Sequence, residues 1–529
     1  YEIRKGDWSS DVCSSDLGFI NAKLMAEALR KTGRDLSREK LVNVLETTPF
    51  DLGGYKINYS SASHNGSRFV DLTVLGRDGR VLAPDVTAAV ARVGALSDLA
   101  HRGMVVELRA NATNGAALAR DFNGTAREQF DGSAKVDLTS GNFSANIGVR
   151  YAPDQRGNDY DFSPSQVAAV WGNWVWYAGY TNLWTGPGED GALLYSNSAR
   201  PMPKFGFKRL VPYTVDFPVL KWLGPLSFEM FLAFQNEPRD YPDAWVIGTR
   251  LSFEPFVGMT FGFNRMQQLC GQNRPCGWSQ IWGSFTGINN GDNSGSSEES
   301  FLAQPGNQIA GFDISYTHRF GQVTAKIYAE AEAEDADNII LEQYARMVGA
   351  TFSGPIGNKG ASWQAGVEYS NTLASQLFEG TFLGSALGDK RFPTSMYNNQ
   401  LYYSGFTYNV KPIGYWTDGD SNNLAFSGAV TDTSNRRWYG SVRFTDINTS
   451  NFGDPGQPVI FPDPPIREGY ISYRISANAE SINILTGGVL WPTRFGDITL
   501  EGRYQSDSPN TPGYVDKQAQ VEIGYLGRF

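Results

Sequence analysis

The chain contains few of the residues that build metal sites and few charged residues. Among its 529 residues there are three Cys and three His, and charged residues make up 19%, whereas soluble domains usually carry about a quarter. No segment offers the roughly 18 to 20 uninterrupted apolar residues that a helix needs to cross a bilayer, which excludes a helical membrane protein. The net charge is −10, from 45 Lys and Arg against 55 Asp and Glu, and it repels a phosphate backbone. We therefore expect no metal ion, no cofactor and no nucleic-acid partner.

Glycine and aromatic residues are abundant, and the chain is long. It contains 58 Gly and 13% aromatic residues. At about 100 to 200 residues per domain, the length alone indicates three domains, with one large barrel as the competing interpretation. The low charge and the aromatic content favour the barrel.

The first seventeen residues, YEIRKGDWSSDVCSSDL, differ from the rest of the chain. They start without Met and have neither the basic nor the apolar region of a signal peptide. The stretch DWSSDVCSSDL resembles the in-frame translation of a sequencing-library adapter, and a polar loop is the alternative. We interpret residues 1–17 as an adapter artefact, so Cys13 leaves the cysteine count and the missing signal peptide carries no information on localisation.

Residues 18–82 have the pattern of a small α/β segment. Apolar residues recur at helical spacing on both sides of a Gly-Arg-Asp break, which predicts two short helices followed by a hairpin. The stretches EALRKTGRDLSREKLVNVLE, FDLGGYKI and HNGSRFVDLTVLGRDGR resemble the C-terminal end of periplasmic substrate-binding proteins for branched-chain amino acids. That family binds its ligand between two lobes, so a fragment of one lobe implies no function here. An assembly chimera and a true fusion both stay open.

Residues 83–121 are richer in Ala, Val, Leu and Arg. We predict one or two helices here, capped near Asp85 or Ser97, as a helical periplasmic region. The predicted helical stripe consists of Val90, Val93, Leu96, Leu99 and Ala100.

From about residue 122 to the terminus, apolar and polar residues alternate in one run after another. The clearest run is Phe143–Tyr151, FSANIGVRY, in which period 2 puts the two sets of side chains on opposite faces of a strand. The preceding alternation reaches Ser140-Gly141-Asn142, which is typical of a hairpin turn. Similar runs lie at 226–234, 323–331, 363–369, 438–444 and 498–504.

Two architectures produce such alternation, a soluble sandwich or propeller and an outer-membrane barrel. The end of the chain favours the barrel, because an alternating face finishes on a C-terminal Phe, which resembles the terminal strand of bacterial outer-membrane proteins. That face consists of Ala519, Val521, Ile523, Tyr525, Gly527 and Phe529. At roughly 20 to 25 residues per strand and connection we expect about 16 to 20 strands, an even number. The predicted fold class is all-β, a transmembrane antiparallel β-barrel over 122–529.

Long connections are predicted at 264–311, 397–435 and 448–469, and such lengths are uncommon unless they are functional. The first connection contains Cys270 and Cys276 in the sequence CGQNRPC, and the rest of the barrel region has no Cys. This pattern predicts a disulfide made in an oxidising compartment. A metal pair is the weaker alternative because no His lies nearby.

The segment 171–201, WGNWVWYAGYTNLWTGPGEDGALLYSNSARP, resembles the signature of the Wzi capsule-assembly family. In that signature a Gly-Asn-Trp strand leads into a Trp-Gly-Pro-Gly turn and then a Ser-Asn-x-Ala-Arg-Pro element. Leu183, Thr185 and Glu189 depart from the pattern, where an Arg, a second Trp and another aromatic are expected, so a divergent branch is implied. The matching residues are Gly172, Asn173, Trp174, Trp184, Gly186, Pro187, Gly188, Asp190, Ser196, Asn197, Ala199, Arg200 and Pro201.

The resemblance covers about 85–529 and implies an outer-membrane barrel of about eighteen strands with a small helical region on the periplasmic side. It also implies a non-enzymatic, lectin-like protein that binds exported capsular polysaccharide and helps assemble or attach the capsule. Its loops would lie at the cell surface. Outer-membrane lipid and the barrel-assembly machinery are the other expected partners, and the protein is expected to be monomeric.

Sugars present flat apolar C–H faces and many hydroxyls, so a binding surface needs aromatic rings beside carboxylates, amides or Arg. The run YWTDGDSNN at 415–423 is the best such cluster, although the same aromatic residues suit the interfacial girdles of any barrel. The candidate glycan-binding residues are Tyr415, Trp416, Asp418, Asp420, Trp278, Trp282 and Arg436, with Tyr402, Tyr403 and Arg437 also in the long connections.

Structural roles compete with glycan binding for the family-matching residues. The Trp184 segment is also typical of a tight turn. We expect Arg200 to pair with a carboxylate of the lumen, such as one of the three that alternation places on a single inward face. Those three are Glu330, Glu332 and Glu334.

Other functions are less well supported. Outer-membrane hydrolases need a Ser/His or Asp/His constellation, and His318, interpreted as a lumen-facing strand residue, is the only His in the barrel region. The prediction is therefore a non-enzyme, while paired carboxylates for glycoside hydrolysis stay open. A substrate-selective porin for sugars or small solutes is the main alternative, and a purely structural barrel is a third.

Overall fold

The computed structural model describes parts of the first hundred residues and most of the remainder. The described residues are 27–33, 37–48, 50–51, 56–57, 74–75, 81–82 and 104–529, the last range with gaps at 116, 120–128, 141, 154–158, 164, 216, 219, 238, 287–305, 335–342, 358–360, 388–390, 394, 400–401, 403, 410, 451–478 and 509–517. The chain divides into two compact units, residues 1–76 with 80–97 and residues 77–79 with 98–529.

The N-terminal unit contains the elements predicted for 18–82. A helix is described over 27–32, and α2 (Arg38–Thr47) begins after Ser37, whose Oγ accepts the Lys40 N–H at 3.2 Å. The expected hairpin forms where β1 pairs antiparallel with β2. The predicted adapter segment and the predicted helical stripe of residues 90–100 lie outside the described residues. The strands of this unit are β1 (Phe50–Asp51), β2 (Lys56–Ile57), β3 (Val74–Leu75) and β4 (Val81–Leu82).

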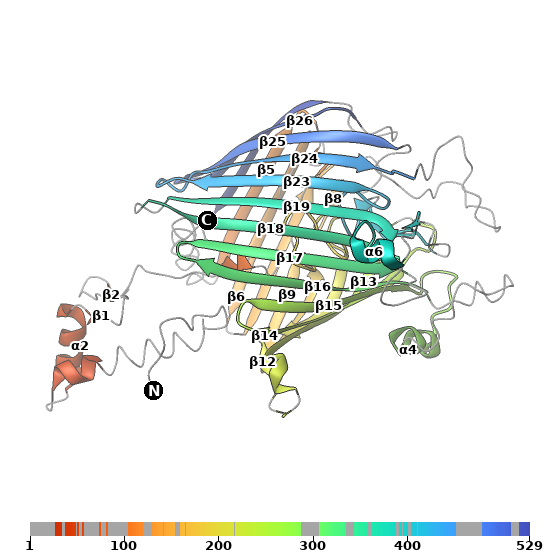
Figure 1. Cartoon of the computed structure of the whole chain (residues 1–529). Helices are drawn as coiled ribbons and strands as arrows, with labels where there is room; N and C mark the ends of the chain where they lie inside the picture. The colour runs from red at the N-terminus through yellow and green to blue at the C-terminus, as the bar shows by residue number, and fades with distance from the viewer. Residues whose placement is uncertain are drawn as a thin grey trace. The chain divides into compact units, whose positions relative to one another are not determined.

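The second unit is a closed antiparallel β-barrel (Figure 1). Twenty-one strand segments form the ring, and β27 pairs with β5 to close it. Three of them, β8, β12 and β20, are two-residue segments beside longer strands that pair directly with one another, so the described residues form an eighteen-stranded barrel. The predicted fold class and even strand number are confirmed.

The bounds of the ring strands follow their order in the chain. They are β5 (Met104–Thr113), β6 (Phe130–Ser140), β7 (Phe143–Tyr151), β8 (Tyr160–Asp161), β9 (Gln166–Trp171), β10 (Trp174–Tyr180), β11 (Pro203–Arg209), β12 (Tyr213–Thr214), β13 (Pro225–Gln235), β14 (Ala244–Phe256), β15 (Met259–Leu269), β16 (Gly306–Phe320), β17 (Val323–Glu334), β18 (Tyr344–Ile356), β19 (Ala361–Ser375), β20 (Arg391–Phe392), β23 (Asn422–Thr431), β24 (Arg437–Ile447), β25 (Glu480–Thr493), β26 (Gly496–Gln505) and β27 (Ala519–Arg528). The connections contain η2 (Lys221–Leu223), α4 (Trp278–Thr286), α6 (Phe382–Leu387), β21 (Thr407–Tyr408) and β22 (Lys411–Pro412).

One predicted domain boundary is too late in the chain. β5 (Met104–Thr113) is a full strand of the ring, although it lies in the range 83–121 for which helices are predicted. Its sequence MVVELRANAT alternates, so that Leu108 is exposed on the outside while Glu107 and Asn111 are buried on the other face. The short period-2 run of β5 begins only four residues after Ala100, the last residue of the predicted helical stripe, so the change of period is easily missed. The barrel therefore begins near residue 104 rather than 122.

The two ends of the barrel differ in their connections. The C-terminal Phe529 lies at the end where most strands are joined by short turns, such as the one that pairs Ser140 with Phe143. We call this the short-turn end, and the opposite end, where α4 and α6 lie, the long-loop end (Figure 1). The predicted hairpin after Ser140 is confirmed. Because strands alternate in direction, the connections that follow β10, β15, β19 and β24 all emerge at the long-loop end.

Two of the predicted long connections have different bounds from those expected. The connection expected at 397–435 lies earlier in the chain, at 376–421 between β19 and β23, so the expected range contains the barrel strand β23. The connection expected at 264–311 contains the last residues of β15 and the first residues of β16. Most of the third, from 451 onward, lies outside the described residues.

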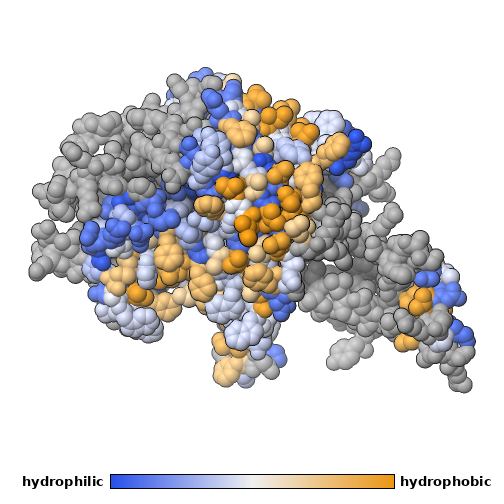
Figure 2. Space-filling model, turned by 180° about the vertical axis from the view of Figure 1, so that it is seen from behind, coloured by the Kyte–Doolittle hydropathy of each residue, from blue (hydrophilic) through white to orange (hydrophobic). Residues whose placement is uncertain are grey.

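The wall of the barrel is apolar outside and polar inside. In β7 the side chains of Ile147 and Val149 are exposed, whereas Arg150 points inward and pairs with the buried Asp131. In β17 the three predicted inward carboxylates are all buried. Figure 2 shows apolar side chains gathered over the outer surface of the wall. This arrangement suits a wall in contact with lipid.

His318 lies on the outer face of β16, five residues from the buried Asp313, and an odd separation puts two strand residues on opposite faces. Its Nδ1 lies 3.3 Å from the Tyr316 hydroxyl on the same outer face. The interpretation of His318 as a lumen-facing residue is therefore wrong.

None of the described helices combines the length and the hydropathy that a membrane-spanning helix requires.

Candidate functional site

The lumen of the barrel is filled by two of the long connections. We call residues 181–202 the first plug segment and the described part of residues 395–421 the second plug segment. Their apolar side chains form one buried core that also includes inward-facing strand residues such as Met347 of β18 and Ile482 of β25. The barrel is therefore packed rather than hollow where these segments cross it.

Three glycines of the first plug segment lie where a side chain would not fit. A Cβ on Gly186 would overlap the carboxylate of Glu330, and a Cβ on Gly188 would overlap the side chain of Met347. A Cβ on Gly191 would overlap the ring of Tyr415. Close approach of the backbone to its neighbours explains why this turn is glycine-rich.

Asp190 is the hub of a polar network inside the plug. Its Oδ1 accepts from the Arg443 guanidinium at 2.8 Å, and its Oδ2 accepts from Trp416 Nε1 at 3.1 Å and from Asn423 Nδ2 at 2.9 Å. Burial opposes the charge of this carboxylate, but the charge and hydrogen bonds of Arg443, with those of Trp416 and Asn423, lower the pKa of Asp190. Asp190 is thus held as a carboxylate that ties the first plug segment to the second and to the wall.

Glu368 of β19 is the second anchor of the same network. Its Oε2 accepts the backbone N–H of Glu189 at 2.6 Å and of Asp190 at 3.2 Å, as well as the Tyr328 hydroxyl at 2.7 Å. Its Oε1 accepts the Tyr415 hydroxyl at 3.2 Å. Burial and the nearby carboxylates raise the pKa of Tyr415, so its hydroxyl stays a donor.

The two plug segments also bind each other directly. The Tyr397 hydroxyl donates to the Leu193 carbonyl and accepts the Tyr415 N–H at 3.1 Å. Ser196 Oγ donates to the Gly414 carbonyl at 2.5 Å. The plug is thus a single hydrogen-bonded body.

The predicted inward carboxylates hold the plug through its backbone and through neighbouring strands. Glu330 accepts the Leu193 N–H at 3.0 Å, and Glu334 accepts the Tyr397 N–H at 2.7 Å. Glu332 accepts from the side chain of Asn264 at 3.0 Å. Each of the three buried carboxylates thus accepts at least one hydrogen bond from the protein.

Arg200 pairs with a different carboxylate from the one expected. Its Nη1 lies 3.5 Å from Asp161 in β8, rather than beside the carboxylates of β17. Arg200 lies at the end of the first plug segment, where the chain returns to the wall, and this position brings it to β8. The expected type of interaction, an ion pair inside the barrel, is confirmed, but the proposed partner is wrong.

The remaining family-matching residues lie at the short-turn end or within the plug. Asn173 accepts the Val211 N–H and donates to the Val211 carbonyl, both at 2.8 Å, while the Arg209 guanidinium lies 4.3 Å from the Trp174 ring. Pro187 presents its carbonyl to Lys326 Nζ at 2.9 Å. Others form the turn or the body of the plug, namely Gly172 with a positive φ, the half-buried Trp184 and Asn197, and the buried Ala199 and Pro201.

The candidate glycan-binding residues are not brought together. Tyr415, Trp416, Asp418 and Asp420 are all buried within the second plug segment, so they present no ring or carboxylate at the surface. Arg436 lies in the turn between β23 and β24 at the short-turn end, where it pairs with Asp432 at 2.7 Å. Contact of these residues with glycan stays a prediction.

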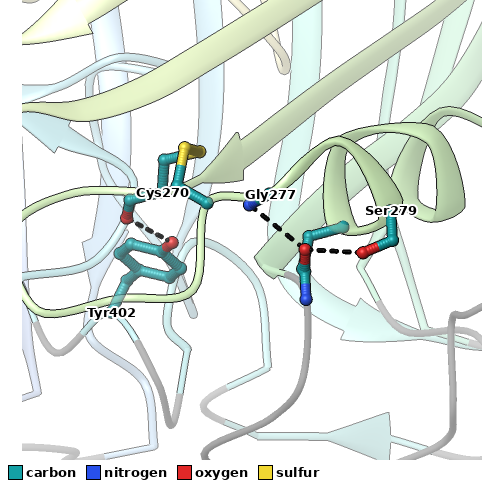
Figure 3. Close-up of a disulfide and its surroundings, with 6 residues drawn as sticks. Cys270, Gly277, Ser279 and Tyr402 are labelled. Carbon is teal, nitrogen blue, oxygen red and sulfur yellow. Dashed lines mark hydrogen bonds between the residues drawn. A yellow bond between two sulfur atoms is a disulfide. The ribbon is translucent and has the colours of Figure 1, made fainter.

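Trp278 and Trp282 lie on α4 at the long-loop end, and both are exposed. Cys270 and Cys276, which precede this helix, form the predicted disulfide (Figure 3). Of the weaker candidates, Tyr402 is buried and donates to the Cys270 carbonyl at 2.9 Å.

Sequence reasoning missed several residues that hold the plug. Glu368, Asn423 and Arg443 lie on strands at inward positions, and their parity within alternating runs is the signal that could have identified them. Arg239, which is buried and donates to the carbonyls of Gly405 and Thr407, carries no such signal because it lies in a connection.

Comparison with known proteins gives the family. A family model described as capsule assembly protein Wzi matches residues 101–430. The chain belongs to the Wzi capsule assembly family. Wzi-family membership and the closed barrel place the protein in the bacterial outer membrane, as expected.

Two Wzi-related proteins show how far the likeness extends. A Klebsiella pneumoniae protein described as an uncharacterized 55.8 kDa protein in the cps region is 34% identical over 146 residues, which are 28% of this chain and 27% of that protein. The chain therefore spans about a quarter of the length of this curated relative. Escherichia coli Wzi, described as an outer-membrane, carbohydrate-binding β-barrel involved in group 1 capsule assembly, matches with a TM-score of 0.63. The identity is 16% over 85% of this chain and 89% of that chain, which shows the shared fold.

Proposed function

We propose that this Wzi-family barrel binds capsular polysaccharide at the cell surface and helps assemble or attach the capsule, without catalysing a reaction. The family and the carbohydrate binding described for Escherichia coli Wzi support the ligand class. The observation that carries the proposal is the buried plug, in which the family-matching segment is tied to the wall through Asp190 and Glu368. A barrel whose lumen is filled suits a protein that holds polysaccharide at the cell surface better than it suits a channel.

The hydrogen bonding of the buried polar groups in the plug also supports a barrel that does not conduct solutes. Asp190 and Glu368 are hydrogen-bonded to protein donors on both carboxylate oxygens. A solute entering the lumen would have to break these bonds, and replacing buried charge-assisted hydrogen bonds is costly. We therefore place polysaccharide binding on the outside of the plug, at the long-loop end.

Tyr415, Trp416, Asp418 and Asp420 contribute to this proposal indirectly. Their buried side chains hold the second plug segment in place. This segment in turn supports the connections at the long-loop end. We also propose the remaining expectations for partners, namely a monomer in contact with outer-membrane lipid and inserted by the barrel-assembly machinery.

Binding of purified capsular polysaccharide to the protein in lipid nanodiscs tests the function. We expect saturable binding that an unrelated neutral glucan of equal length does not show. Equal binding of both polymers, or of neither, would contradict the proposal.

Conductance in planar bilayers tests the porin alternative. We expect no steady openings from the native protein because the plug fills the lumen. Steady openings that small sugars block would favour the porin instead.

A further inference from the structure

Helix α4 (Trp278–Thr286) lies against the outside of the barrel wall. Its Ile281 packs against a buried cluster formed by Ile247 of β14, Leu269 of β15 and Cys270. Both wall residues face outward, because the adjacent Gln268 faces the lumen, where it donates to the buried Gln235 at 2.7 Å. The helix is therefore on the side of the wall that lipid contacts, and not over the mouth of the barrel.

A hydrogen bond from the wall fixes the end of this helix. Arg265, an outward residue of β15, donates from Nη1 to the Phe285 carbonyl at 2.7 Å and from Nη2 to Gln308 of β16 at 2.7 Å. A cation at the last carbonyls of a helix is stabilising.

Three aromatic side chains form an exposed ridge along α4. Trp278, Trp282 and Phe285 follow a spacing of four and three residues, which places them on one helical face. Their exposed fractions are 74%, 53% and 43%. Neighbouring rings are stacked with centroids 6.4 Å and 6.0 Å apart. We call these three residues the aromatic ridge.

The ridge lies near the edge of the apolar outer surface that is closer to the long-loop end. Phe263 is 52% exposed and lies on the same outward face as Arg265, two residues nearer the middle of β15. Two residues of a strand span about 7 Å. On β15 and β16 the polar outward side chains Arg265 and Gln308 therefore follow the apolar ones at the height where Phe285 is bound, and the outward Ile247 and Leu269 beyond them are buried. This is the level at which aromatic residues concentrate in membrane proteins.

The start of the helix is fixed as well (Figure 3). The Cys270–Cys276 disulfide closes the loop before α4, and the Cys270 carbonyl accepts the Tyr402 hydroxyl from the second plug segment. Gln280 Oε1 accepts the Gly277 N–H at 3.1 Å and the Ser279 hydroxyl at 2.9 Å. The ridge is thus held in place from both ends rather than carried on a loose loop.

We propose that α4 is an interfacial helix whose aromatic ridge inserts into the outer leaflet at the boundary between headgroups and acyl chains. The ridge is continuous with the lipid-facing wall, and the sequence WSQIWGSFT contains no charged residue. A sugar site would pair aromatic rings with carboxylates, amides or Arg. This helix contains no carboxylate or Arg, and the oxygen of its one amide, Gln280, accepts bonds from Gly277 and Ser279, whereas a short apolar helical face suits the interface. This inference goes beyond polysaccharide binding and assigns Trp278 and Trp282 to lipid.

Site-specific fluorescence tests the proposal. In a Cys13→Ser background, a dye is attached at Trp278→Cys on the ridge or at Ser279→Cys, an exposed neighbour about 100° around the helix. Each labelled protein is placed in nanodiscs holding one barrel, with lipids brominated near the headgroup. We expect lipid bromine to quench the label at 278 at least about twofold more than the label at 279, and aqueous iodide to show the reverse order.

Each other outcome would overturn the proposal. Equal quenching by lipid bromine at both positions would show that the ridge is not the side of α4 that enters lipid, and stronger iodide quenching at 278 than at 279 would place the ridge in water. Shielding of the label at 278 from iodide only after capsular polysaccharide is added would make the ridge a glycan platform, and shielding only in discs with two barrels would make it a contact between copies. Labelled proteins are first checked for heat-dependent migration in detergent gels, and Trp282→Cys provides a second ridge position if Trp278→Cys does not fold.

Discussion

The wall and the plug of this barrel bury polar groups in different ways. Each wall strand satisfies its backbone through its two neighbours, so its side chains only need to be apolar on one face and polar on the other. The plug has no such ladder over most of its length and relies on side chains, with Asp190 and Glu368 accepting bonds from backbone, tyrosine, tryptophan and arginine donors. The comparison indicates that single substitutions disturb the plug more than the wall.

Loss of the Asp190 hub is expected to have the largest effect. Asp190→Ala leaves the Arg443 guanidinium buried without its carboxylate, and breaking such a pair costs about 3 kcal/mol or more. We expect a loosened plug and steady openings in bilayer recordings. Asp432→Ala, which removes a half-buried ion pair from a short turn far from the plug, is the matched control and should change neither the packing of the plug nor the conductance. Unchanged conductance in folded Asp190→Ala barrels would refute the assignment of Asp190 as the hub.

Filling the space at Gly191 is expected to have the next largest effect. In Gly191→Ala the new methyl group overlaps the Tyr415 ring, and overpacking typically costs about 1–3 kcal/mol. Gly487→Ala in β25 is the control, because a Cβ there meets nothing within 4 Å. Thermal unfolding in detergent should separate the two variants. Equal midpoints would mean that the Tyr415 ring yields to the new methyl group and that the plug is not tightly packed at Gly191.

Acid should open the plug only at low pH. The pKa of Asp190 is lowered in the folded protein, so the stability that this carboxylate contributes is present above its unfolded pKa of about 3.9 and is lost as pH falls through the lower folded value. We expect no change in conductance between pH 7 and pH 5 and a rise below about pH 4. A rise already near pH 6 would show that a different group controls the plug.

Arg436→Ala is expected to have the smallest effect. Arg436 lies at the short-turn end, and its ion pair with Asp432 is half-buried and partly screened by solvent, so its loss should cost about 1 kcal/mol or less. Polysaccharide affinity should stay unchanged because the long-loop end is untouched. A clear loss of affinity would mean that the polysaccharide reaches the opposite end of the barrel.

The strands of the wall could be predicted because their signal is local. Phe143–Tyr151 and the terminal strand alternate with period 2 over their whole length, and the inward position of the β17 carboxylates follows from the same parity. The prediction failed for Met104–Thr113, where a short alternating run follows a helical pattern. The disulfide could also be predicted, since two Cys stand six residues apart in a region with no other Cys.

The residues of the plug could not be assigned in the same way. Tyr415 and Trp416 have the composition of a sugar-binding loop, and their burial depends on Asp190, which lies more than two hundred residues earlier in the chain. The partner of Arg200 likewise depended on where the first plug segment returns to the wall. Composition identifies residues that suit polar and aromatic neighbours, but it does not say whether a sugar or the protein itself provides those neighbours.

The sequence by itself determined the class of this protein, because a lipid-facing wall requires alternation in every strand and the Wzi-like segment is continuous in the chain. Only the tertiary structure decided which connections turn inward and which helix rests on the outer wall. The physical reason is that a strand's parity is set by its nearest neighbours along the chain. The choice between lumen, surface and lipid depends instead on partners that folding brings together from distant segments.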